Sequence, residues 1–142
     1  MPLISVTRLR VRGLLYLPGF VLRTFQSAFQ AKAAAGNLRM RLLRDARLAF
    51  WTVTVWESEA AMRDFMLAGA HRKAMHNLLE WCDEAALAHW QDDNAAPPDW
   101  LTAHKLLLER GRTSKVRHPT ADHLAFSVPL PVVEVGRVLN FK

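Results

Sequence analysis

The segment Ala49–Trp56 constrains the fold most, because it is a strand pattern with large side chains on both of its faces. One face would carry Phe50, Thr52, Thr54 and Trp56, and the other Trp51, Val53 and Val55. A strand of this kind lies inside a sheet that is covered on both sides, since neither face tolerates water. The sequence therefore predicts a central strand here, with other parts of the protein packed above and below it.

Apolar periodicity predicts five further elements in the first ninety residues. They are a strand over 3–12, a helix over 20–35, a strand over 38–42, a helix over 59–68 that continues after Gly69 over 70–84, and a strand over 86–90. The order β-α-β-β-α-β is that of a ferredoxin-like protomer, an α+β fold with both helices on one sheet face. We expect a second copy of the chain to cover the other face, which would otherwise be a large exposed apolar patch.

The composition changes after Asp92, where the linker that contains Pro97 and Pro98 begins. We therefore place a ferredoxin-like domain at residues 1–92 and a C-terminal extension at residues 93–142. The extension is expected to contain a helix over 100–110, a basic segment and an edge strand over 124–128. We expect it either to wrap around a partner or to cover a pocket.

Charge and cysteine content exclude or disfavour several classes of protein. The net charge of +6 favours anionic partners, but the aromatic residues occupy core positions, which argues against nucleic acid as the partner. Arg8, Arg10 and Arg12 are interpreted as a solvated sheet edge, and they interrupt what would have to be the apolar part of a leader. Cys82 is the only cysteine, which excludes a disulfide scaffold. No apolar run approaches the ~18 residues of a membrane span. We expect a cytoplasmic location.

The segment from Phe50 to Met75 combines a strand that ends in Trp-Glu-Ser with a helix that reaches Gly69-Ala-His71. It resembles the dimeric α/β-barrel superfamily of antibiotic biosynthesis monooxygenases. Within it, the segment is most similar to spheroidene monooxygenase-like proteins and a related uncharacterised family. The resemblance covers residues 3–92 and implies a dimeric α/β barrel with a pocket between each sheet and its helices.

This resemblance implies a monooxygenase-like oxidoreductase that acts on a flat or polyene apolar substrate. It leaves the cofactor open, and haem is one option. The Trp and His of the haem-degrading members would fall on Phe65 and Met75, so that particular pair is absent. The alternative is a homodimer of the same fold that binds a small apolar ligand without catalysis, since one fold supports many functions.

His71 is the candidate for catalysis or haem ligation, because it opens a helical stripe that continues through Met75, Leu78 and Cys82. Its alternative role is a core or capping histidine. His76 lies beside the stripe and is interpreted as a surface contact of Glu80. No metal site is expected, because a five-residue spacing places His71 and His76 on divergent helix faces.

Aromatic and thioether side chains would shape the pocket, since flat apolar ligands pack on such groups. Trp56 and Phe65 are the candidates for contact with a cofactor. The substrate-pocket candidates are Trp51, Phe25, Phe29 and Met75. Packing in the core or at a dimer interface is the alternative for each of them.

Overall fold

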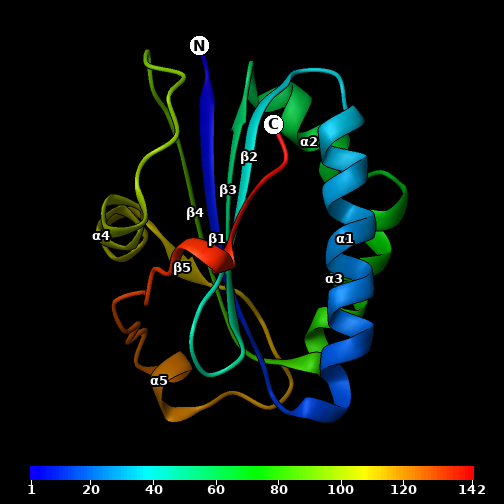
Figure 1. Ribbon diagram of the computed structural model, residues 1–142, viewed down its shortest axis with the longest axis vertical. Coiled ribbons are helices and arrows are strands. Elements are labelled where there is room, and N and C mark those ends of the chain that lie inside the picture. Colours follow the sequence, from blue (N-terminus) through cyan, green and yellow to red (C-terminus); the bar gives the residue numbers. More distant parts are fainter.

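The computed structural model describes residues 1–142, the side chains of Ala70 and Val135 excepted. It shows one antiparallel sheet in the strand order β5-β4-β1-β3-β2-β6, with helices on both faces (Figure 1). The first part of the chain forms β1 (Leu3–Val11), α1 (Leu17–Ala33), β2 (Asn37–Arg44), β3 (Ala49–Trp56), α2 (Glu59–Met66), α3 (Gly69–Trp81) and β4 (Cys82–Gln91). This confirms the α+β fold and the β-α-β-β-α-β order.

The predicted central strand is β3, with the predicted bounds. It pairs with β1 on one side and with β2 on the other. Both of its faces are buried: Trp51 and Val53 lie in one apolar cluster, and Trp56 lies in another on the opposite face. Two-sided burial of β3 thus follows from its sequence pattern.

The chain leaves α3 earlier than predicted, because residues 82–84 belong to β4. Cys82 pairs with Val11 and Glu84 pairs with Arg10 across the β1–β4 ladder, which has a bulge between Arg10 and Val11. The predicted helical stripe therefore ends at Leu78. Cys82 is buried in the sheet, where burial and the neighbouring charge of Asp83 raise the pKa of its thiol to about 12.

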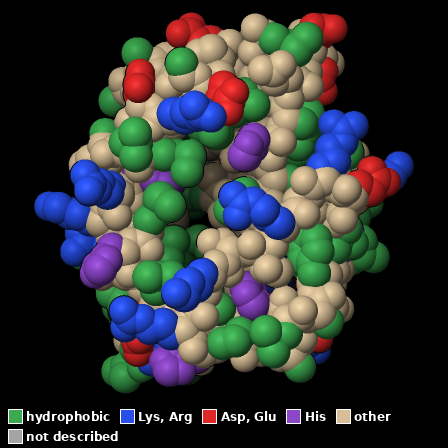
Figure 2. All heavy atoms as spheres, turned by 180° about the vertical axis from the view of Figure 1, so that it is seen from behind, with side chains coloured by type: hydrophobic (Ala, Val, Ile, Leu, Met, Phe, Trp, Pro, Cys, Tyr) green, Lys and Arg blue, Asp and Glu red, His purple; other side chains and the backbone are tan. Residues whose placement is uncertain are grey.

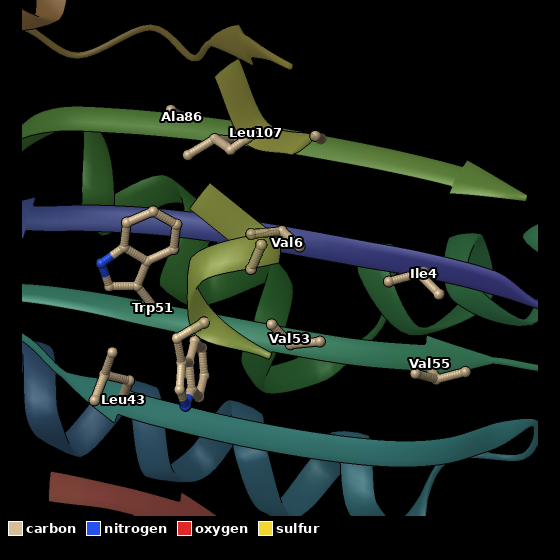
Figure 3. Close-up of a cluster of buried hydrophobic side chains, with 11 residues drawn as sticks. Ile4, Val6, Leu43, Trp51, Val53, Val55, Ala86 and Leu107 are labelled. Atoms are coloured by element: carbon tan, nitrogen blue, oxygen red, sulfur yellow. The ribbon is translucent and has the colours of Figure 1, made fainter. Parts of the chain in front are cut away.

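The elements of the C-terminal extension are α4 (Trp100–Arg110), β5 (Arg112–Thr113), α5 (Ala121–Leu124), η2 (Val135–Arg137) and β6 (Val138–Asn140). Its helix α4 covers the sheet face opposite α1 and α3, and β5 and β6 are the two edge strands of the sheet. Trp100 and Leu107 of α4 pack in one cluster with Val6, Trp51 and Val53 (Figure 3). The chain's own extension thus occupies the face for which a second copy was expected. A homodimer stays a prediction, but the exposed sheet face from which it was predicted is covered by α4.

The strand expected over 124–128 is wrong. Residues 121–124 form α5, whose N-terminus is capped by the Thr120 side chain, and Phe126 adopts a positive φ of 51°. Farther along, the backbone N–H of Val132 donates to the buried Asp45 carboxylate, which also accepts from Trp51 Nε1. Capping and side-chain hydrogen bonds hold this segment, and no ladder forms there.

Candidate functional site

A cavity of about 930 Å³ opens between α3 and the helix-facing side of β1 and β4. Leu9 and Ala85 line it from the sheet, and Leu78 and Leu79 line it from α3. Figure 2 shows a hollow on the face turned away from the view of Figure 1, with Lys, Arg and His side chains on the surface around it. A pocket between the sheet and its helices is what the sequence resemblance implied.

The C-terminal extension supplies one wall of this cavity. Residues 114–117, which we call the strap, cross from β4 to the end of α3. The N–H of Ser114 donates to the Ala85 carbonyl at 2.9 Å, and the N–H of Arg117 donates to the Leu79 carbonyl at 3.0 Å. Val116 of the strap is buried against the helix-side core. The extension therefore bounds the pocket, one of the two positions expected for it.

The described residues that line the cavity include cations and no carboxylate. The cations are Arg23 of α1, Arg72 and Lys73 of α3, and Lys115 of the strap. His76 is the one histidine among them. The rim of the cavity is therefore positively charged, above an apolar floor.

Glu80 lies near the end of α3 and is held by cations outside this lining. Arg12 contacts its carboxylate at 2.8 Å and Arg117 at 3.3 Å. Desolvation would raise the pKa of Glu80, but the charges of Arg12 and His118 and the hydrogen bonds from Arg12 and Arg117 lower it on balance. Because Glu80 is engaged in this way, the expected contact with His76 does not form, and His76 is exposed at the cavity instead.

Trp56, Phe65 and His71, the candidates for contact with a cofactor, come together in a packed stack. The Trp56 and Phe65 rings are stacked with centroids 5.1 Å apart, and the His71 ring lies 4.5 Å from that of Phe65. The N–H of His71 donates to Gln30 Oε1 at 2.8 Å. Burial lowers the pKa of His71, opposed in part by its contact with the Met66 carbonyl, so this imidazole is neutral near pH 7.

His71 is not among the residues that line the cavity, so a haem bound there would not be ligated through that residue. Its Nδ1 lies 3.4 Å from the Met66 carbonyl oxygen, and its ring packs against Phe65, which is buried. None of the stacked residues lines the 930 Å³ cavity. The geometry thus supports a role for His71 in fixing the start of α3.

Of the four predicted substrate-pocket residues, Met75 lines the cavity and the other three lie elsewhere. Trp51 is on the opposite sheet face, because successive strand residues point to opposite sides, and there its Nε1 donates to Asp45. The inward face of α1 is formed by Phe20, Ala28 and Ala31.

Phe25 and Phe29 lie off that inward face of α1, so neither lines the cavity. Their ring centroids lie 6.1 and 6.2 Å from that of Phe141, near the C-terminus. These two phenylalanines therefore pack with the end of the extension, and Phe29 remains 61% exposed.

The arginines of β1 are ion-paired inside the protein, so their interpretation as a solvated edge is wrong. Arg8 contacts Glu84 at 2.7 Å and Arg10 contacts Asp83 at 2.6 Å. The reason is topological: β1 is an inner strand, and β4 brings two carboxylates beside it. The sequence signal for these ion pairs was the Asp83-Glu84 pair. It was missed because both residues were assigned to the end of a helix and not to β4.

Two further kinds of feature are absent from the described part of the chain. No group of three or more His, Cys, Asp or Glu residues there could hold a metal ion. No helix among these residues is long and apolar enough to cross a membrane.

Three solved structures share this fold at low sequence identity. SnoaB from Streptomyces nogalater, described as a cofactor-independent oxygenase, is 17% identical with a TM-score of 0.56, over 68% of this chain and 98% of SnoaB. Rv0793 from Mycobacterium tuberculosis is 13% identical with a TM-score of 0.61, over 68% of this chain and 100% of Rv0793. A protein from Nitrosomonas europaea, described as a candidate antibiotic biosynthesis monooxygenase, is 13% identical with a TM-score of 0.58, over 65% of this chain and 90% of its own.

These three structures are matched over nearly their whole length, so about a third of this chain has no counterpart in them. That share agrees in size with the extension of residues 93–142. No curated protein matches the chain in sequence. A model of the family described as a domain of unknown function, DUF3291, matches residues 16–127, which include α4 and the strap. The chain therefore belongs to the DUF3291 family and has the α+β fold of the antibiotic biosynthesis monooxygenase-like proteins.

Proposed function

We propose that this protein is a monooxygenase-like enzyme that binds an apolar substrate in the cavity between α3 and the sheet. The observation that carries the proposal is the cavity itself, with Leu9, Leu78, Ala85 and Val116 among its lining residues, in a fold shared with a cofactor-independent oxygenase. Apolar walls with a few polar groups at the rim are typical of small-molecule sites.

The size of the cavity favours a flat polycyclic or an extended polyene molecule. Its volume of about 930 Å³ lies near the upper end of the range of ~300–1,000 Å³ that is usual for ligand pockets. A small hydrophilic substrate would leave most of the apolar floor in contact with water.

His76 is the group that we assign to proton transfer. It is the one histidine among the described residues that line the cavity, and imidazole is the side chain most often used for proton transfer near neutral pH. Loss of a proton from an acidic C–H group of the substrate gives an electron-rich anion that molecular oxygen can oxidise. In the balanced reaction, one methylene group of the substrate and one molecule of oxygen give one ketone group and one molecule of water, with molecular oxygen as the oxidant. His71, which the helical stripe favoured, is our second candidate; it is half-buried and does not line the cavity.

A binding protein of the same fold is the alternative, and the lining of the cavity favours it in one respect. The described lining residues include no Asp, Glu, Tyr or Cys, so a single imidazole would have to supply the acid–base chemistry. A protein that only binds an apolar ligand needs no such group.

Oxygen uptake with 1,8-dihydroxyanthrone as the substrate separates the two functions. We expect uptake above the uncatalysed rate, with a ketone product one oxygen heavier and two hydrogens lighter than the substrate. His76→Ala should lower kcat by about 100-fold or more, since a positioned acid or base contributes about that much. His89→Ala is the matched control, because His89 is exposed on β4 and does not line the cavity.

Saturable binding of the anthrone without turnover would favour the non-catalytic alternative. Full turnover in His76→Ala together with its loss in His71→Ala would transfer the chemistry to His71. If the protein neither binds nor turns over flat apolar compounds, the proposed function is contradicted.

A further inference from the structure

The cations around the cavity come from three separate parts of the chain. Arg23 belongs to α1, Arg72 and Lys73 begin α3, and Lys115 lies on the strap. Segments far apart in sequence thus bring positive charge to one hollow. A helix face that is merely solvated would not require matching charges from the opposite wall.

These cations lack acidic partners among the described residues, whereas half of the arginines outside the cavity lining have them. Arg8, Arg10, Arg12, Arg63, Arg117 and Arg137 each contact a carboxylate within 4 Å. Arg23 donates only to the neutral side-chain amide of Gln26, at 3.1 Å. Arg72, Lys73 and Lys115 form no ion pair with a described residue. The positive charge is therefore left uncompensated at the cavity.

A hollow with one sign of charge on low-dielectric walls concentrates the field and attracts the opposite charge. The floor below is apolar, through Leu9, Leu78, Ala85 and Val116. The site is thus complementary to a molecule with an apolar body and an anionic end. A bare inorganic anion would leave the apolar floor in contact with water, and a neutral hydrocarbon would leave the cations without a counter-charge.

We propose that the ligand of this cavity is an apolar carboxylic acid. Its carboxylate would lie among Arg72, Lys73 and Lys115, and its ring system or chain would lie on the apolar floor. This inference rests on the proposed function for the cavity and adds the charge class of the substrate. Single-stranded nucleic acid fits less well, because its bases stack on aromatic side chains and the described lining residues include no Phe, Tyr or Trp.

Two fluorescent probes with the same apolar body test the charge preference directly. 1-Pyrenebutyrate carries a carboxylate and 1-pyrenebutanol carries a neutral hydroxyl, and both are titrated into the protein at low and at high salt. We expect the carboxylate to bind about tenfold more tightly at low salt, as two or three partly exposed ion contacts would give. The difference should shrink at 1 M salt, where the Debye length falls to ~3 Å.

Arg72→Ala/Lys73→Ala should bring the Kd of the carboxylate close to that of the alcohol and leave the Kd of the alcohol unchanged. The control is Arg44→Ala/Lys105→Ala, which removes the same charge from exposed residues on β2 and α4, away from the cavity. This control should bind both probes as the unmodified protein does.

The outcomes separate the two proposals. Equal affinity for both probes, unaffected by Arg72→Ala/Lys73→Ala, would overturn the anionic ligand and leave the apolar cavity in place. An equal loss of carboxylate affinity in both double variants would overturn it too, since net charge alone would then explain the preference. If neither probe binds, the cavity is not a ligand site and both proposals fail.

Discussion

Arg8 of β1 and Glu84 of β4 form an ion pair at 2.7 Å, with both side chains at most 9% exposed. The hydroxyl of Thr120, which caps α5, donates to the second Glu84 oxygen at 2.8 Å. The pair thus joins the sheet to the C-terminal extension. Taking two charges out of water is costly, and their mutual attraction offsets that cost only while both members are present.

Removing one member should cost much more than removing both. We expect Arg8→Leu to lower the free energy of unfolding by about 3–5 kcal/mol, because it leaves the Glu84 carboxylate buried without its cation. Arg8→Leu/Glu84→Leu should recover much of that loss in urea denaturation. Arg63→Ala breaks the exposed pair with Glu59 and should cost at most about 1 kcal/mol. An Arg8→Leu variant as stable as Arg63→Ala would contradict this expectation.

Acid should destabilise the protein through Glu84. Burial would raise the pKa of this carboxyl, but hydrogen bonds from Arg8 and Thr120 and the charges of Arg8 and Arg10 lower it on balance, below its ordinary value of 4.5. A lowered folded-state pKa gives stability that is present above pH 4.5 and is lost as the pH falls toward the folded-state pKa. Denaturation between pH 7 and pH 3 should therefore show a smaller loss of stability in Arg8→Leu/Glu84→Leu. Identical pH profiles would assign the acid sensitivity to other groups.

Asp45 should control the attachment of the segment near residue 132. Its buried carboxylate accepts from Trp51 Nε1 at 2.9 Å and from the N–H of Val132 at 2.9 Å. Asp45→Ala leaves these donors unpaired and should cost about 1–3 kcal/mol for each one that stays buried. We also expect limited proteolysis to cut near Val132 earlier in the variant. Asp122→Ala, at an exposed site on α5, is the control. An unchanged cleavage pattern in Asp45→Ala would show that this attachment has little effect.

Gly111 should tolerate no side chain. A Cβ there would lie 2.3 Å from the Leu107 carbonyl oxygen and 2.7 Å from the Leu87 carbonyl oxygen, both of which are backbone atoms. Gly111→Ala should therefore displace α4 from the sheet, which differential scanning calorimetry would record as a lower Tm. Gly136→Ala is the matched control, because nothing lies within 4 Å of its added carbon. Equal Tm values for the two variants would contradict the close approach of α4 to β4.

Most of the fold could be predicted from the sequence because its signals are local. The alternation in Ala49–Trp56 depends on near neighbours, and the strand that it predicted is confirmed. The caps that Ser58 and Asp99 form on α2 and α4 are equally local. The end of α3 was misplaced because the Asp83 and Glu84 side chains are compatible with a helix surface until β1 brings Arg8 and Arg10 beside them. The order of strands in the sheet decides that pairing.

The extension and the site were harder to predict for the same reason. Long-range hydrogen bonds, from Val132 to Asp45 and between His104 and the Val128 carbonyl, hold a segment that has no regular pattern of its own. Aromatic character alone does not tell which sheet face a residue occupies: Trp51 and Trp56 belong to the same strand but lie on opposite faces. Of the predicted substrate contacts, only Met75 lines the cavity. The cations at the rim resemble solvated surface residues until the strap and α1 are placed opposite α3.

A crystal structure of the protein with 1-pyrenebutyrate bound is the most direct test of the central claim that the cavity beside α3 is the ligand site. We expect the pyrene to lie on Leu9, Ala85 and Val116, with the carboxylate toward Arg72 and Lys73. A pyrene bound instead between α4 and the sheet, or against Phe25 and Phe29 on α1, would contradict it.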